Sequence, residues 1–427
     1  MASTPVSDVK KSGINPIIII GALFFIFGFV TWMNSILIPY LKIACQLTNV
    51  EAYLVTTAFY SPYLLMALPS AWLLKMLGFK NGMAAGLIIM GIGALLFIPA
   101  ALTRTYIVFL FGLFFQGTGL AVLQSASNPY ITIIGPPEGA VKRMSIMGIC
   151  NKFAGVLAPL ALGAVVFKGI DGFTANLAKL DAVAKAAALD QLASKVILPY
   201  ILIIVVLVVL SVLIYFSSLP EINTDEEDEA VAEANTDKTS IFQFPHLLLG
   251  VLALFLYVGA EVIAGDSIIS YGSSHHIPLS VARFFSSCTL GLMVGGYFIG
   301  VFCIPRFVTQ QKALVISAIL GLILTIIALF TPPYVSIACI ALLGLANSLM
   351  WPAIWPLALS GLGKFTKIAS SLLVMGIAGA AVFPLAYGGL VDVLSAQTAY
   401  VILLPIYLFI LYFATVGYKK GKHVIAV

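Results

Sequence analysis

Three ionisable side chains lie near the middle of long apolar segments: Lys152, Glu261 and Asp266. A charge at that depth is costly in lipid, so it usually faces a water-filled passage or another charge. Such groups can bind a proton, bind a cation or exchange ion-pair partners. We therefore interpret the three as coupling or gating residues. The competing interpretation is a structural ion pair between Lys152 and one of the two acids.

Uncharged amides form a second polar set inside apolar segments. Gln124 and Asn128 are four residues apart, so in a helix they share one face. Each amide offers two donors and an acceptor, which suits the hydroxyl groups of a sugar. Asn34 and Asn151 extend the set. We predict that these four side chains bind substrate; hydrogen bonding between helices is the alternative.

An aromatic pair follows in "NSLMWPAIWPLALSG". Trp351 and Trp355 are also four residues apart, and an indole can stack on the C–H face of a pyranose ring. Asn347 lies four residues before Trp351 and is predicted to continue the same face. The alternative is an interfacial aromatic belt, although both tryptophans fall near the middle of an apolar run.

The chain lacks the motifs of an enzyme. It contains no nucleotide-phosphate loop, no G-x-S-x-G and no H-E-x-x-H. Its five cysteines have no metal-ligand spacing and mostly lie in apolar runs. We expect no catalytic residues, no metal site, no nucleic-acid partner and no cofactor, apart from a possible coupling ion, H⁺ or Na⁺.

These residues must be positioned by membrane helices. Of 427 residues, 61% are hydrophobic and 9% charged, against about 25% charged in soluble domains. A helix needs about 20 apolar residues to cross a bilayer, and twelve such runs can be read. They cover residues 16–41, 50–77, 81–102, 105–134, 141–168, 197–218, 244–272, 279–303, 309–331, 333–362, 365–391 and 397–418. The fold predicted is an all-α integral membrane protein.

Two longer loops interrupt the pattern. Residues 169–196 are polar and Ala-rich and predict one short surface helix. Residues 219–243 form an acidic linker, "EINTDEEDEAVAEANTDK", that divides the chain into six helices and six helices. We therefore predict an N-terminal six-helix bundle over 1–218, a cytoplasmic linker over 219–243 and a C-terminal six-helix bundle over 244–427.

The two halves of the sequence resemble each other. "NSILIPY" at 34–40 echoes "DSIISY" at 266–271, and Pro129 in one half is matched by Pro352 and Pro356 in the other. Matched, proline-interrupted helices point to a transporter site between two repeats.

Loops on the side of both termini hold more Lys and Arg than the opposite loops, which predicts that both termini are cytoplasmic.

Four segments are characteristic of a known family: "FFIFGFVTWMNSILIPYLK", "LQSASNPYITIIGPPE", "YVGAEV" and "SSLLVMGIAGAAVFPL". With them, the chain resembles the major facilitator superfamily, and within it the glucose/galactose transporter branch of the fucose–proton symporters, from about residue 20 to residue 415. The resemblance implies twelve helices in two pseudo-symmetric bundles. It also implies a bacterial inner-membrane protein.

Departures from that family bear on the mechanism. The fucose symporters have Asn-Asp where this chain has Asn34-Ser35, and Glu where it has Gln124. Those acids are the family's proton-handling and sugar-binding carboxylates, so the resemblance implies that coupling cannot use them here. A small polar residue is expected where this chain has Lys152. Three mechanisms remain open: titration of Glu261, sodium binding by Glu261 and Asp266, or an uncoupled facilitator with Lys152 as a fixed internal cation.

The function predicted is transport of a monosaccharide such as glucose or galactose by alternating access, with a cation as the favoured coupling ion. The alternatives are an uncoupled facilitator, a transporter of acidic or amino sugars, and a sugar sensor that does not transport. The expected partners are a small sugar and the lipid bilayer, and the expected oligomeric state is a monomer.

Overall fold

The computed structural model describes residues 16–133, 140–177, 179–217, 219, 240–304, 306–362 and 365–421. The predicted linker therefore lies almost wholly outside the described residues, and the predicted division of the chain there stays a prediction. Every regular element of the described part is helical.

The described residues of the first half form eleven α-helices, and several membrane-crossing segments consist of more than one of them. They are α1 (Pro16–Trp32), α2 (Asn34–Ala44), α3 (Asn49–Tyr60), α4 (Pro62–Leu65), α5 (Ala67–Leu95), α6 (Phe97–Thr103), α7 (Tyr106–Ile133), α8 (Ala140–Val166), α9 (Ile170–Leu177), α10 (Ala182–Ser194) and α11 (Ile197–Phe216).

The described residues of the second half are also helical. Its α-helices are α13 (Pro245–Asp266), α14 (Ile268–Ser274), α15 (Leu279–Cys303), α16 (Gln310–Phe330), α17 (Pro333–Asn347), α18 (Met350–Leu359), α19 (Thr366–Met375), α20 (Gly379–Val393) and α21 (Leu403–Thr415). Short 3-10 turns lie at η2 (Ile241–Gln243), η4 (Gly376–Ala378), η5 (Thr398–Ile402) and η6 (Gly417–Lys419).

Eleven helices of the described part are long and apolar enough to cross a membrane. Each matches one predicted run, and the run left over is 50–77. That run is helical but divided among α3, α4 and the start of α5, because the helix is interrupted at Ser61, just before Pro62, and again at Met66. The chain then turns sharply at Gly78, with φ 78° and ψ 170°, into the next span.

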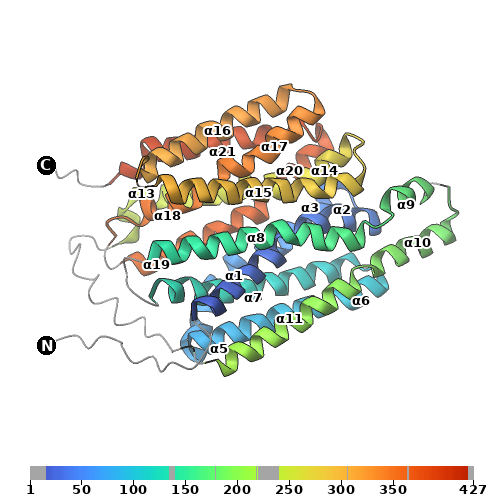
Figure 1. The fold of residues 1–427 in the computed structure, drawn as a ribbon, viewed down its shortest axis with the longest axis horizontal. Coiled ribbons are helices and arrows are strands. Elements are labelled where there is room, and N and C mark those ends of the chain that lie inside the picture. The colour runs from blue at the N-terminus through green and yellow to red at the C-terminus, as the bar shows by residue number, and fades with distance from the viewer. Residues whose placement is uncertain are drawn as a thin grey trace.

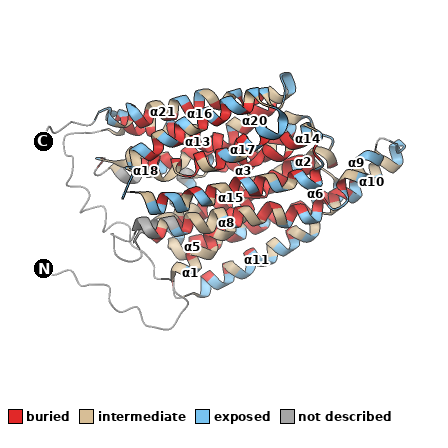
Figure 2. Ribbon diagram, turned by 45° about the horizontal axis from the view of Figure 1, so that its top comes forward, coloured by how far each residue is buried: buried red, intermediate tan, exposed pale blue. Residues whose placement is uncertain are grey.

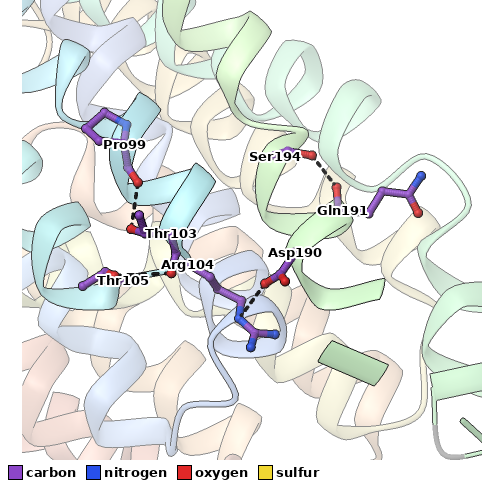
Figure 3. A network of polar contacts seen from close by, with 7 residues as sticks. All are labelled: Pro99, Thr103, Arg104, Thr105, Asp190, Gln191 and Ser194. Atoms are coloured by element: carbon purple, nitrogen blue, oxygen red, sulfur yellow. Dashed lines mark hydrogen bonds and ion pairs between the residues drawn. The ribbon is translucent and has the colours of Figure 1, made fainter. Parts of the chain in front are cut away.

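The polar stretch 169–196 forms two helices, α9 and α10, where one was predicted. They project from one end of the molecule (Figure 1). The guanidinium of Arg104, at the end of α6, lies 3.2 Å from the carboxylate of Asp190 on α10 (Figure 3). Helix α10 then leads almost directly into the membrane helix α11.

The helices form two groups that lie side by side (Figure 1). Helices α1 to α11 pack mainly on one another, as do α13 to α21, and the largest contacts between groups are α3 with α20 and α8 with α15. Buried residues line the interior, whereas α11 exposes much of its surface (Figure 2). Its exposed side chains, such as Val205 and Val209, are apolar, as expected where lipid is the solvent.

The groups are joined at the end where α2 meets α3 and α14 meets α15, which we call the distal end. There the carboxylate of Asp392, on α20, accepts hydrogen bonds from the backbone N–H groups of Asn49 and Val50 at the start of α3, and from the Asn49 amide at 2.6 Å. In the matching place, the Asp171 carboxylate accepts from the Leu279 N–H at the start of α15, at 2.9 Å. Each half thus supplies one carboxylate that caps a helix of the other half.

Candidate functional site

A buried ion pair joins the two groups of helices at their centre. Lys152 of α8 pairs with Glu261 of α13, and their side chains are only 12% and 8% exposed. The Lys152 ammonium also lies 4.8 Å from the centre of the Trp32 ring, at the end of α1. Of the two acids that the sequence offered to Lys152, the structure selects Glu261.

Trp32 is held by two glycines and was not singled out from the sequence. A Cβ atom on Gly265 of α13 would lie 2.3 Å from the Trp32 ring, and one on Gly155 of α8 would lie 2.5 Å from it. The indole therefore needs both glycines to fit between the helices. Its buried Nε1–H has no hydrogen-bond partner among the described residues. The sequence signal that could have identified Trp32 was its position two residues before Asn34, a predicted site residue.

Tyrosines surround the ion pair. The hydroxyls of Tyr257, Tyr297 and Tyr407 lie within electrostatic range of Glu261. Tyr407 also donates a hydrogen bond of 3.0 Å to the side-chain oxygen of Asn347. The sequence gives little signal for these tyrosines, because a tyrosine in an apolar run usually only packs.

Asp266 lies at the end of α13, five residues after Glu261, and is fully buried. Neither of its carboxylate oxygens has a hydrogen-bond partner among the described residues. The phenols of Tyr53 and Tyr60, both on α3, lie within electrostatic range of it. No group of three or more His, Cys, Asp or Glu that could hold a metal ion occurs in the part of the chain that the structure describes.

Two of the predicted amides are buried with unused hydrogen-bonding groups. Asn34, at the start of α2, is fully buried, and neither its oxygen nor its nitrogen has a partner among the described residues. The Asn347 nitrogen is likewise unpartnered there, while its oxygen accepts from Tyr407. A buried amide without partners is unfavourable, so such groups are suited to receive a polar ligand.

Gln124 and Asn128 share one face of α7, because that helix is continuous from Tyr106 to Ile133. The Gln124 amide donates to the Tyr63 hydroxyl of α4 at 2.9 Å, and Asn128 is half-buried. Helix α7 runs through Pro129, whose side chain lies outside the described residues. Gln124 thus keeps its side-chain oxygen available beside a tyrosine that can also bind a hydroxyl.

Asn151 has a different use in the structure. Its amide donates to the backbone carbonyl of Phe24 at 3.3 Å, which ties α8 to α1. The helices are close there, since a Cβ on Gly28 would lie 1.9 Å from the Asn151 carbonyl oxygen. This is the helix–helix hydrogen bond that was the alternative to sugar binding for the amides.

Trp351 and Trp355 stack on each other, with ring centres 5.3 Å apart and planes 23° apart. Both are half-buried and lie on α18. Asn347 is the last residue of α17, and the helix is interrupted before α18 begins at Met350. The predicted continuous face is therefore broken, and the three side chains do not follow one regular helix.

Known proteins resemble this chain along most of its length. It is 32% identical to a glucose/galactose transporter of Brucella abortus over 410 residues, which is 93% of each chain. It is 30% identical to an L-fucose-proton symporter of Escherichia coli over 375 residues, covering 87% of this chain and 85% of that one.

The fold of this chain also matches the folds of known transporters. The crystal structure of a Major Facilitator Superfamily transporter, FucP, in the outward conformation matches with a TM-score of 0.70 at 27% identity, covering 96% of this chain and 99% of that one. A D-xylose-proton symporter shares the fold with a TM-score of 0.68. The family model described as Major Facilitator Superfamily matches residues 20–377. With two groups of membrane helices joined around a buried polar centre, this chain belongs to the Major Facilitator Superfamily.

Proposed function

We propose that this protein carries a monosaccharide across the bacterial inner membrane by alternating access, in symport with a cation. The observation that supports this best is the buried polar centre between the two groups of helices, where Lys152 pairs with Glu261. Relatives named as glucose/galactose transporter and L-fucose-proton symporter support a hexose or a related sugar as the substrate. Both termini are cytoplasmic in this proposal, and the protein acts as a monomer.

The sugar is bound by neutral groups. Asn34 and Asn347 present buried amide groups without partners, and Gln124 with Tyr63 adds a further amide and hydroxyl. Asn128 lies on the same face as Gln124. Hydrogen bonds from such groups give selectivity, because each stays unsatisfied when a substrate lacks the matching hydroxyl. Trp351 and Trp355 form the aromatic wall of the proposed site.

The ion pair links transport to movement. Lys152 and Glu261 lie on helices of different groups, so rocking of the groups must separate or reorient them. Breaking a buried pair is costly unless another partner replaces the lost one. Sugar hydroxyls and the surrounding tyrosines can supply such partners. A neutral sugar is favoured over an acidic one, because the charge of Lys152 is already matched by Glu261.

Sugar counterflow tests the substrate class. Proteoliposomes loaded with unlabelled D-glucose are diluted into labelled D-glucose, and D-galactose, L-fucose, D-glucosamine and D-glucuronate are added as competitors. We expect saturable counterflow that galactose inhibits and glucuronate does not. Stronger inhibition by glucuronate or glucosamine would instead indicate a charged-sugar transporter. Binding of glucose without any counterflow would indicate a sensor and contradict the proposal.

A further inference from the structure

We propose that Asp266 is the residue that carries the coupled proton, and that Glu261 serves as the ion-pair partner of Lys152. This rests on the proposed function, which it deepens by naming the ion and its carrier. In this proposal, closure of the two groups of helices at the distal end requires Asp266 to be protonated.

The first argument is burial without a partner. Asp266 is fully buried, and neither carboxylate oxygen accepts a hydrogen bond from a described residue. An ionised carboxylate in such a place is strongly unfavourable, whereas the neutral acid is tolerated. The two ion pairs among the described residues are Arg104–Asp190 and Lys152–Glu261, and neither includes Asp266.

The second argument is the sign of the charges around Asp266. Glu261 lies on the same helix within electrostatic range of Asp266, and its negative charge disfavours a second one nearby. From α3, Tyr53 and Tyr60 face Asp266, and both are neutral phenols at physiological pH. Lys152 faces this region from α8 but is already engaged by Glu261. None of these described groups offers a free positive charge to an ionised Asp266.

Groups on the remaining neighbouring elements do not reverse this conclusion. Next to Asp266, the Ser267 hydroxyl is hydrogen-bonded to the Tyr400 hydroxyl of η5 at 2.7 Å. Tyr387 of α20 donates to the Ala396 carbonyl at 3.0 Å. Asn34 and Ser35 are the buried polar residues at the start of α2, which packs on α13, and neither carries a charge. These neighbours offer hydroxyls and amides but no cation.

The two acids of α13 therefore have different tasks. In this arrangement Glu261 has Lys152 as its counter-ion, so we assign it to the ion pair between the groups. Asp266 has none, so its protonation depends on whether water reaches it. Sodium is the competing ion, and dependence of transport on sodium is one of the outcomes that would overturn the proposal.

Alternating access then gives a complete proton cycle. Asp266 lies on α13 of one group and faces α3 of the other, so movement of the groups changes its access to water. When open to the outside, the carboxylate takes a proton from hydronium and leaves water. Neutral Asp266 permits closure of the distal end. When open to the cytoplasm, Asp266 returns the proton to water, and the carboxylate is restored.

The test separates exchange from accumulation. The full-length protein and its Asp266→Asn variant are placed in proteoliposomes and supplied with labelled D-glucose. Asn resembles the protonated acid in shape and charge but cannot release a proton. We expect Asp266→Asn to keep equilibrium exchange within about twofold of wild type. Accumulation driven by a proton gradient, and glucose-driven proton uptake reported by a trapped pH dye, should both be lost.

A matched control and a spectroscopic measurement complete the test. Asp190→Asn makes the same chemical change at a side chain that is 57% exposed, and should leave both activities unchanged. Infrared spectroscopy of the wild-type protein at neutral pH should show the C=O stretch of a protonated carboxyl group. That band should be absent from Asp266→Asn, or, if this variant does not fold, should shift in Asp266→Glu.

Every outcome bears on the proposal. Accumulation by Asp266→Asn, loss of its exchange together with accumulation in a folded protein, dependence on sodium instead of protons, or no protonated carboxyl in the wild type would each overturn it. If wild-type protein moves no glucose, the proposed function fails, and the infrared band alone decides whether Asp266 holds a proton.

Discussion

Lys152 and Glu261 are two charges that the protein has removed from water and placed together. Such a pair often contributes little net stability, but removing one partner leaves a buried charge unpaired at a cost of about 3–5 kcal/mol. Together with the contact of the ammonium with Trp32, this makes the pair the most demanding local arrangement at the centre of the molecule.

The first prediction follows from that asymmetry. Lys152→Met and Glu261→Gln should each lower the free energy of unfolding by about 3–5 kcal/mol, while the double variant should lose much less than the sum. Thermal unfolding in detergent measures this cycle. Additive losses would show that the two side chains do not depend on each other.

The second prediction concerns substrate affinity. Gln124→Ala should raise the KM for glucose by about tenfold, corresponding to ~1.4 kcal/mol, with little change in kcat. Tyr63→Phe removes the internal partner of Gln124 but leaves its amide, so its effect should be only about twofold to threefold. Equal effects would mean that Gln124 serves only to hold Tyr63.

Sequence alone identified the buried charges but could not decide how they pair. Glu261 and Asp266 are five residues apart, which places them about 140° apart around a helix. Only the rotation of α13 determines which acid meets Lys152, and rotation depends on packing by distant residues such as Gly265 against Trp32. For the same reason the sequence could not show that the Asn151 amide donates to a backbone carbonyl on another helix.

The second predicted span, residues 50–77, differs from the other predicted spans because it has no membrane-length helix of its own in the described part. An apolar run shows that a segment can enter the membrane, but it does not show whether the helix is continuous. Pro62 and the break at Met66 divide this span, and Gly78, inside α5, turns the chain into the next span with a positive φ that only glycine adopts readily. The break places Tyr63 where it meets Gln124.

The third prediction tests that turn. Gly78→Ala should destabilise the protein by about 1–3 kcal/mol, because a side chain is strained at φ 78° and ψ 170°. Gly91 lies on the same helix, and a Cβ there would meet no atom within 4 Å. Gly91→Ala should therefore be neutral or stabilise by up to about 1 kcal/mol. The midpoint of thermal unfolding distinguishes the two, and equal effects would contradict the assigned turn.

The fourth prediction concerns the distal end. Asp392 caps α3 and Asp171 caps α15, and each contact crosses between the two groups of helices. Asp392→Ala should weaken closure by about 1 kcal/mol, because a carboxylate at a helix N-terminus contributes up to about that much. The population open at the distal end should rise, most strongly when Asp171→Ala is added. Distances between spin labels on α2 and α14 measure this, and an unchanged distribution would contradict a closing role.

On the scale of the whole molecule, polar contacts hold the groups of helices together both at the distal end and at the centre. The two aspartate caps lie at the distal end, and the Lys152–Glu261 pair lies at the centre. Composition and hydropathy were sufficient to predict a multi-helix membrane fold, and the matching motifs predicted its family. They could not predict which end is closed, because the same sequence must support both arrangements during transport.

One measurement tests the central claim of cation-coupled sugar transport most directly. Labelled D-glucose uptake into proteoliposomes is followed under an inward proton gradient, under a sodium gradient and with neither. We predict accumulation above equilibrium with the proton gradient alone, abolished when the gradient is collapsed. Uptake that only equilibrates under all three conditions would contradict coupling, and the absence of saturable uptake would contradict glucose transport itself.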